Sequence, residues 1–294
     1  MLGRACFSAN TAILAAALLG SCLTVVALAD PLSPTVTSGL TNDQSNASQE
    51  SSYNGDDFTR PETSASLRVE LRKSSGAASS TEREIEILQY NSKLKLSFDW
   101  TFATQIQIPF DEKTTLVDQS EPENAAGLSD TIFQAALIRT VSNRWAYGFG
   151  ARLVAPTATD SVGTDRWQIM PAAGVRYSFL EFNADTYFVP VMRYAISFGG
   201  NPTARTIREP QIAPTLNIGL PDNWFVTLYP SNDIRINFGT PISGQTGRLF
   251  LPFDAAFGKK VTDNLTVSLE GSVPIVKDYP VYDFKTELKA TWQF

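Results

Sequence analysis

The side chains of this chain that could do chemistry are carboxylates, lysines and arginines, because none of its 294 residues is histidine. Without an imidazole the chain cannot form a Ser-His-Asp triad, a histidine zinc site or a histidine acid/base pair. Asp283 and Glu287 are close enough in sequence for paired-carboxylate chemistry. They alternate with Lys285 and Lys289, however, which favours ion pairing. We therefore expect no enzymatic activity, no cofactor and no metal site.

The segment that carries these four residues alternates between apolar and polar side chains. Its even positions, from Tyr282 to Phe294, are mostly aromatic or aliphatic, and its odd positions, from Asp283 to Gln293, are charged or polar. A β-strand directs successive side chains to opposite faces, so this strand should separate an apolar environment from a wet one. The same period of two recurs at 67–72, 99–110, 145–153, 167–177 and 265–275.

Strands of this kind repeat to the end of the chain, and short turns alternate with longer polar loops. This arrangement is typical of an antiparallel meander with two unlike ends. The segment 223–238 contains Pro230-Ser231-Asn232-Asp233, a candidate turn, but one interrupted strand there keeps every short turn at the same end. We expect about 12 strands, with 14 possible, near 64–72, 83–92, 96–110, 130–141, 144–155, 166–178, 183–198, 206–220, 223–238, 248–260, 263–275 and 281–294.

The alternation predicts an all-β fold, a transmembrane antiparallel up-and-down β-barrel. Many apolar stripes begin or end in an aromatic residue, such as Trp100 and Phe110 or Trp167 and Tyr177, which is typical of the interfacial girdles of membrane barrels. A soluble β-sandwich also alternates, but it leaves edge strands that need protection, whereas a closed barrel leaves none. Segments of about ten residues also suit tilted membrane crossings.

The N-terminal residues 1–29 are predicted to be a signal peptide. Arg4 precedes an uncharged, mostly apolar run that ends in Ala27-Leu28-Ala29, a small-x-small cleavage pattern. Two alternatives stay open: the run could persist as an anchor helix, and Leu19-Gly20-Ser21-Cys22 is similar to a lipobox, which would direct lipoprotein processing at Cys22. Residues 30–63 are polar and aperiodic, so we expect a disordered leader before a barrel at 64–294.

If the apolar faces contact lipid, the opposite faces line the lumen of the barrel. Their acidic and basic residues are equal in number, and such a balance does not predict ion selectivity. The charges could pair across the lumen and partly plug it, or they could line a narrow, wet pore for small polar solutes. The expected pore-lining acids are Glu70, Asp99, Asp185, Glu209, Asp254, Glu270, Asp283 and Glu287, and the expected bases are Arg68, Arg72, Arg152, Arg176, Arg193, Arg235, Lys285 and Lys289.

The C-terminal residues Tyr282, Phe284, Leu288, Trp292 and Phe294 form a pattern similar to the signal that barrel-assembly machinery reads in Gram-negative outer-membrane proteins. We therefore expect export through the periplasm to the bacterial cell outer membrane. The expected partners are outer-membrane lipid, this machinery and a small-molecule solute. The net charge of −6 gives the chain no electrostatic drive toward nucleic acid.

Four stretches of the chain are similar to motifs of a known family: GLSDT at 127–131, WAYGFG at 145–150 followed by APTATD at 155–160, RWQ at 166–168 with PAAGV at 171–175, and TWQF at 291–294. Residues 64–294 as a whole resemble the "MetA-pathway of phenol degradation" family of transporter-like outer-membrane barrels. The resemblance implies an outer-membrane location and the passage of small compounds, aromatic ones included.

Two functions follow from these features. The first is a pore or transporter that passes small solutes by passive diffusion through a charge-balanced lumen. The alternative is a closed structural or adhesive barrel whose surface loops bind a partner. The acidic stretch 111–127 is expected to be a long loop that either constricts the pore or faces such a partner.

Overall fold

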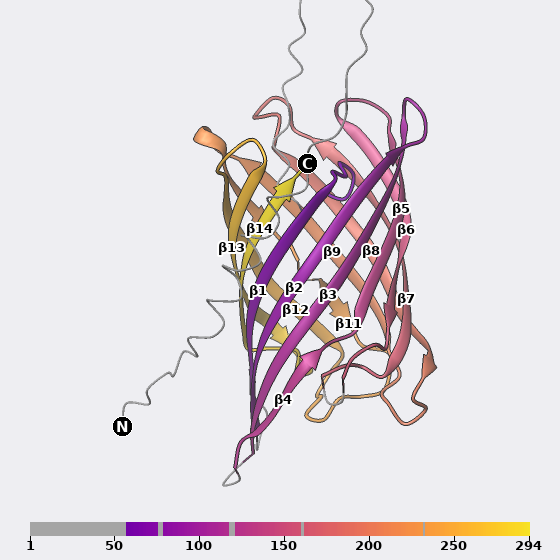
Figure 1. The fold of residues 1–294 in the computed structure, drawn as a ribbon, viewed down its shortest axis with the longest axis vertical. Coiled ribbons are helices and arrows are strands. Elements are labelled where there is room, and N and C mark those ends of the chain that lie inside the picture. The colour runs from indigo at the N-terminus through magenta and orange to yellow at the C-terminus, as the bar shows by residue number, and fades with distance from the viewer. Residues whose placement is uncertain (1–56, 76–78, 118–120, 160–161, 232) are drawn as a thin grey trace, which may run out of the picture. The chain divides into compact units, whose positions relative to one another are not determined.

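The computed structural model describes residues 57–294 except 76–78, 118–120, 160–161 and 232, and these form one antiparallel sheet closed into a barrel (Figure 1). Residues 1–56, which hold the predicted signal peptide and most of the predicted leader, lie outside the described residues. No helix within the described ranges is long and apolar enough to cross a membrane. The strands are β1 (Ser64–Ser75), β2 (Ser79–Lys95), β3 (Trp100–Val117), β4 (Glu123–Leu128), β5 (Thr131–Thr140), β6 (Trp145–Ala155), β7 (Arg166–Ser178), β8 (Tyr187–Gly200), β9 (Arg208–Gly219), β10 (Trp224–Leu228), β11 (Ile234–Ile236), β12 (Leu249–Lys260), β13 (Leu265–Lys277) and β14 (Phe284–Gln293), with a 3-10 turn, η1 (Pro221–Asn223), between β9 and β10.

The barrel closes between its first and last strands, where β1 pairs antiparallel with β14 from Ser64↔Gln293 to Lys73↔Phe284. β10 and β11 both pair with β9 and with β12, so they are two halves of one interrupted strand. β4 and β5 likewise pair with successive parts of β3. The described segments therefore form a barrel of 12 strands, which confirms the predicted fold class, the strand number and the interruption within 223–238.

Strands extend further than we expected in two places. β3 continues to Val117 and pairs with β4 over Phe110–Thr115, so the expected loop at 111–127 is wrong and a β-hairpin takes its place. β1 and β2 likewise extend beyond the expected strands at 64–72 and 83–92, to Ser75 and back to Ser79. These hairpins reach beyond the rest of the sheet at the end away from the C-terminus (Figure 1). The ends of these hairpins carry polar side chains on both faces, as expected for strands that extend beyond the lipid. Their threonine and valine residues favour an extended backbone.

The outer face of the sheet carries the apolar residues and the inner face the polar ones, as the alternation predicts. On β14, Leu288 and Trp292 are exposed on the outside, whereas Lys285, Glu287 and Thr291 are buried inside. The same division holds on β1 and β13, where Glu70, Glu270 and Ser272 are among the buried polar residues. An apolar exterior and a polar interior invert the arrangement of a soluble sandwich and fit a barrel surrounded by lipid.

Aromatic residues gather on the outer face at both ends of the barrel. Near the short turns, the ring centroids of Trp145 and Tyr177 lie 4.8 Å apart, and Trp224 stacks on Phe257 at 4.7 Å. Near the longer loops, Trp167 lies 6.4 Å from Phe198. Two such belts are typical of the membrane–water interfaces of transmembrane barrels.

The first described residues, 57–63, lie inside the barrel rather than outside it. The Phe58 ring packs against a cluster of buried residues on the inner wall, and a Cβ added at Gly148 or Gly174 would approach this ring to 2.8 Å. The two glycines therefore make the room that the ring occupies. The wall cluster consists of Tyr187, Val189, Val191 and Ala213.

Polar contacts also hold this segment in the lumen. The carboxylate of Asp57 is buried, and it accepts a hydrogen bond from Arg176 Nη1 at 3.4 Å. Arg60 Nη2 donates to Ser178 Oγ at 3.2 Å, and its guanidinium lies 5.5 Å from the ring centre of Tyr187. The predicted leader was drawn to residue 63, but its last seven residues, 57–63, are positioned against the inner wall.

Candidate functional site

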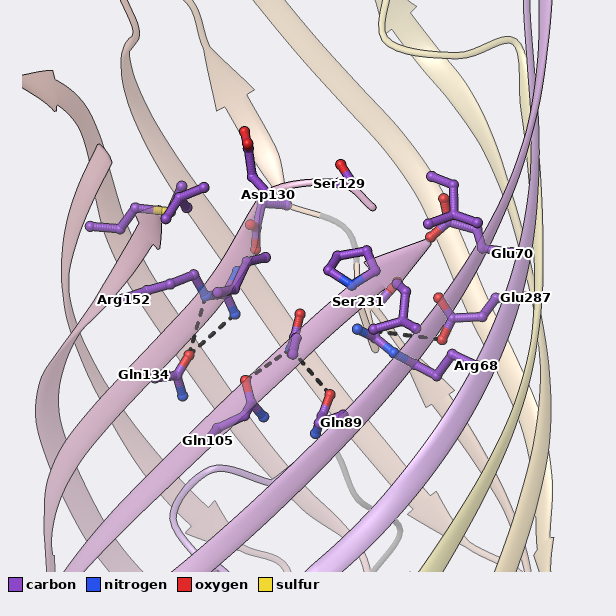
Figure 2. A pocket seen from close by; sticks show the side chains of 18 of the residues that line it. Arg68, Glu70, Gln89, Gln105, Ser129, Asp130, Gln134, Arg152, Ser231 and Glu287 are labelled. Atoms are coloured by element: carbon purple, nitrogen blue, oxygen red, sulfur yellow. Dashed lines mark hydrogen bonds and ion pairs between the residues drawn. The ribbon is translucent and has the colours of Figure 1, made fainter. Parts of the chain in front are cut away.

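A cavity of about 520 Å³ lies inside the barrel (Figure 2). Its lining runs from Asn91 and Gln105, near the short turns, to Asp111 and Asp130, near the longer loops. Side chains from β1, β2, β3, β5, β6 and β14 form its wall. The inward segment at 57–63 and the break between β10 and β11 narrow it, through Phe58 and Ser231 among others.

The wall made by β13, β14 and β1 carries charges in rows. Strand register places Glu70, Glu287 and Glu270 side by side on three neighbouring strands, with Lys285 and Arg72 in the next row. Like charges directly opposite one another destabilise a sheet. The rows are therefore stabilised by contacts from one row to the next.

Lys285 makes most of these contacts between rows. Its ammonium lies 2.6 Å from a carboxylate oxygen of Glu270, 3.3 Å from one of Glu287 and 3.5 Å from one of Glu70. Arg72 pairs with Glu70 as well. Lys285 is 1% exposed, so these ion pairs are shielded from solvent and are stronger than pairs at the surface.

The break between β10 and β11 is not a turn but an inward fold of the chain. Pro230 cannot donate to the sheet ladder, and Tyr229 adopts a positive φ of 53° that directs the chain away from the sheet. Ser231 Oγ donates to Glu270 at 2.6 Å and accepts from Lys285 Nζ at 2.5 Å. Arg193 Nη1 donates to both carboxylate oxygens of Asp233 at 2.7 Å. The inward segment between β10 and β11 is therefore bonded to both sides of the lumen.

Three arginines, Arg152 on β6, Arg193 on β8 and Arg235 on β11, line the cavity away from the wall made by β13, β14 and β1, and Arg68 lines it from β1. The guanidinium of Arg152 interacts electrostatically with those of Arg68, Arg193 and Arg235 and with the carboxylate of Asp233. Arg152 Nε and Nη2 donate to Gln134 Oε1 at 3.3 and 3.2 Å, as Figure 2 shows. Arg68 lies 3.8 Å from a carboxylate oxygen of Glu287. Basic charge is thus concentrated around Arg152.

A network of amide side chains extends along β2 and β3, and the sequence analysis did not assign it a role. Gln107 Nε2 donates to Gln89 Oε1 at 3.1 Å, and Gln105 Nε2 donates to Asn91 Oδ1 at 2.9 Å. Asn91 then donates to Ser64 Oγ on β1 at 3.0 Å. The signal in the sequence is the presence of amides at alternate positions of two adjacent strands. These groups give the cavity a polar, uncharged wall.

Most of the expected pore-lining residues lie on the inner face, but their surroundings differ. Asp254 and Glu270 are buried in the wall beside the inward fold, and Arg176 pairs with Asp57 near the short turns. Asp185 lies in the segment that leads into β8, and its backbone carbonyl accepts a hydrogen bond from Asn217 Nδ2. Glu209 forms an ion pair with Arg205. Of the charged residues that the sequence analysis named, those that line the cavity itself are Arg68, Glu70, Arg72, Arg152, Arg193, Arg235, Lys285, Glu287 and Lys289.

Asp99 and Asp283 do not line the cavity. Asp99 lies in the turn between β2 and β3, where a hydrogen bond from Arg139 Nε at 2.9 Å holds the pKa of its carboxyl below the usual value. Asp283 precedes β14 and pairs with Lys277. Burial raises the pKa of Asp283, but the hydrogen bonds from Lys277 and Ser75 and the positive charge of Lys277 together outweigh it, and the net pKa is lowered.

The expected C-terminal assembly residues lie on the outer face, with one exception. Phe284, Leu288, Trp292 and Phe294 are exposed. Tyr282 instead turns inward, packs on Phe250 at 5.0 Å between ring centroids, and shares a hydrogen bond of 2.7 Å with Ser272 Oγ. Burial raises the pKa of Tyr282 to about 12. The strict alternation therefore begins at Phe284, because the chain before it still belongs to the loop.

Two of the sequence motifs contact each other at the end of the barrel with the longer loops. Thr159, in the APTATD stretch, donates from its backbone nitrogen to the carbonyl of Leu128, in GLSDT, at 2.9 Å. Asp130 Oδ2 accepts from both the backbone nitrogen and Oγ1 of Thr164, at 2.8 and 2.5 Å. A Cβ at Gly127 would lie 1.9 Å from Thr159 Oγ1. The motifs thus lock the β6–β7 loop onto β4.

No group of three or more cysteine, aspartate or glutamate side chains in the described ranges is arranged to hold a metal ion. The closed sheet, the apolar exterior and the charged cavity together define a bacterial outer-membrane β-barrel. The chain belongs to the family described as "Putative MetA-pathway of phenol degradation", whose sequence profile matches residues 55–273, more than half of the chain. This confirms the family that the motifs predicted and the outer-membrane location.

Solved structures with the same fold agree with this assignment. The chain is similar to the COG4313 outer membrane channel from Pseudomonas putida F1, with a TM-score of 0.63 and 15% identity over 81% of this chain and 97% of that one. It is also similar to the β domain of the Bordetella autotransporter BrkA, with a TM-score of 0.51 and 10% identity over 80% of this chain and 100% of that one. No curated protein sequence matches the chain significantly.

Proposed function

We propose that the barrel is a pore through which small solutes cross the outer membrane by passive diffusion. The observation that carries this proposal is the cavity of about 520 Å³, whose charged and amide lining extends from the short-turn end to the long-loop end. A structural barrel with no traffic through it would gain stability from an apolar or fully packed interior. The channel from Pseudomonas putida F1 is consistent with this role, since it shares the fold.

The solutes are small because two parts of the chain narrow the lumen: residues 57–63, and the break between β10 and β11 at Pro230, Ser231 and Asp233. Both contribute lining residues to the same cavity, including Phe58, Pro61 and Ser231. The lining also includes the apolar side chains of Ile85, Ile87 and Ile132, which offer a surface for an aromatic ring. We propose that aromatic compounds are among the solutes, as the family description indicates.

The test is single-channel recording with the full mature protein in planar bilayers. Stable current steps are expected, and the aromatic alcohol benzyl alcohol should reduce the open current more than glycerol does at equal concentration. Equal effects of the two alcohols would remove the aromatic part of the proposal. Silence from protein that a heat-modifiability gel shows to be folded would reject the pore and favour the closed barrel whose surface hairpins bind a partner.

A further inference from the structure

The arginines of the cavity carry more positive charge than their neighbours neutralise. Arg152 interacts electrostatically with Arg68, Arg193 and Arg235, and with the carboxylate of Asp233. Arg193 already engages both oxygens of this carboxylate. Glu287, which Arg68 approaches at 3.8 Å, is shared with Lys285 at 3.3 Å. The acids of the opposite wall are likewise committed to Lys285 and Arg72.

Several donors of these arginines lack a partner. In the described part of the chain, Nε of Arg68 and Nε of Arg235 are buried and make no hydrogen bond. Arg152 Nε and Nη2 donate their hydrogen bonds to a neutral amide, that of Gln134. Each guanidinium presents donors in a planar fork that matches a carboxylate. Charged donors withdrawn from bulk water without an acceptor are costly, so the cluster is suited to an anion that enters the cavity.

The geometry points to a binding site for small organic carboxylates at this arginine cluster, and we propose that such anions are the preferred solutes of the pore. All four arginines line the same cavity of about 520 Å³, which is large enough for a small molecule. Ile87, Ile132 and Ala136 line the cavity as well, so an apolar body attached to the carboxylate has a wall to contact. The inference rests on the proposed pore and names its solute class.

The experiment uses the mature protein in planar bilayers, with benzoate as the probe and benzamide as its uncharged analogue. Benzoate should block the open current at lower concentration than benzamide. Arg235→Gln and Arg152→Gln should each weaken the benzoate block about tenfold, because a hydrogen bond to a charged group is lost, and should leave the benzamide effect unchanged. The matched control is Arg139→Gln, which removes the same charge from the outer rim, where Arg139 pairs with Asp99.

The outcomes separate the site from the pore. Equal block by benzoate and benzamide, or an undiminished benzoate block in both cavity variants, would overturn the carboxylate site while the pore survives. If the wild-type protein carries no current, the pore fails, and calorimetric titration of the folded protein with benzoate and benzamide decides the site by itself. The site is supported if the wild type binds benzoate more tightly than benzamide and the Arg235→Gln and Arg152→Gln variants lose this preference. Equal binding of benzoate and benzamide to the wild type rejects the site. A heat-modifiability gel confirms that each variant is folded.

Discussion

Lys285 is the cation that compensates the three neighbouring carboxylates in the charged wall of the barrel. Its ammonium lies within 3.5 Å of carboxylate oxygens of Glu70, Glu270 and Glu287, and it is almost completely buried. The three carboxylates sit side by side in register, where they would repel one another without a cation between them. An intact buried ion pair contributes little net stability, because desolvating both charges offsets their attraction. Removing only one partner is costly, because the other charge stays buried without compensation.

The first prediction concerns this residue. Lys285→Met should destabilise the barrel by about 3–5 kcal/mol, because three buried carboxylates lose their shared cation. Urea unfolding in lipid vesicles, followed by tryptophan fluorescence, measures the loss. The control is Lys93→Met, since Lys93 forms an exposed pair with Glu62 and such pairs contribute at most about 1 kcal/mol. Equal losses in the two variants would contradict the assigned role of Lys285.

The second prediction is a pH dependence at Asp283, a carboxylate outside the strands. Although burial raises it, the pKa of Asp283 is held below its usual value by hydrogen bonds from Lys277 and Ser75 together with the charge of Lys277. Its contribution to stability is therefore present above the unfolded-state pKa of about 4 and is lost as the pH falls through the lower folded-state pKa. Unfolding of the wild type and of Asp283→Asn should differ at pH 7 and converge in acid. A difference that persists unchanged in acid would reject the ion pair with Lys277.

At the scale of elements, the interrupted strand matters most for the site. β10 and β11 keep the pairing with β9 and β12 on both sides, so the barrel stays closed while the chain between them folds inward. Tyr229 Oη donates to the carbonyl of Pro252 at 3.0 Å, which anchors the start of this fold to β12. Closure satisfies the backbone groups that lipid would leave unpaired, and the inward fold narrows the lumen without opening the sheet.

The third prediction tests which face of β14 contacts lipid. Leu288 is 52% exposed on the outer face, whereas Lys289 lines the cavity. Leu288→Arg should therefore harm assembly more than Lys289→Leu, because a charge facing lipid costs about 2–4 kcal/mol at the bilayer midplane. Yields of heat-modifiable folded protein in outer-membrane fractions measure the effect. Equal yields, or the reverse order, would mean that the faces are assigned wrongly.

At the scale of the whole molecule, the barrel is a cylinder whose interior is partly filled by its own chain. Residues 57–63 are held to the inner wall by Phe58 and by the pair between Asp57 and Arg176. These contacts join the N-terminal side of the barrel to β6, β7, β8 and β9. The width of the lumen therefore depends on a segment that precedes the first strand.

The fourth prediction follows from this arrangement. Phe58→Ala should weaken the docking of residues 57–63 by up to about 3 kcal/mol, because a partly buried phenyl ring that packs on an apolar cluster is lost. Single-channel conductance should rise as the segment leaves the lumen more often. Phe98→Ala is the control, since Phe98 is 96% exposed in the turn between β2 and β3. An unchanged conductance in Phe58→Ala would show that the segment does not narrow the path of ions.

Sequence reasoning was strongest for features that repeat locally. It predicted the barrel, the 12 strands and the inward side chains of β1 and β14, because side-chain alternation is a property of each strand alone. It was wrong about 111–127, because a polar composition does not reveal that a strand continues beyond the lipid. It was also wrong about Tyr282, because alternation in the sequence does not reveal at which residue a strand begins. It also gave no role to the amides of β2 and β3.

Local sequence patterns were thus enough to predict a closed barrel with a charged interior, because the period of two defines the two faces of each strand, and the aromatic ends of the apolar stripes favour a membrane barrel over a sandwich. The tertiary structure alone decided which charges meet. Arg68, Arg152 and Arg235 lie far apart in the chain and converge only through strand register and barrel closure. The parts of the chain that narrow the cavity, residues 57–63 and the break between β10 and β11, depend on the same long-range contacts, and no local pattern encodes them.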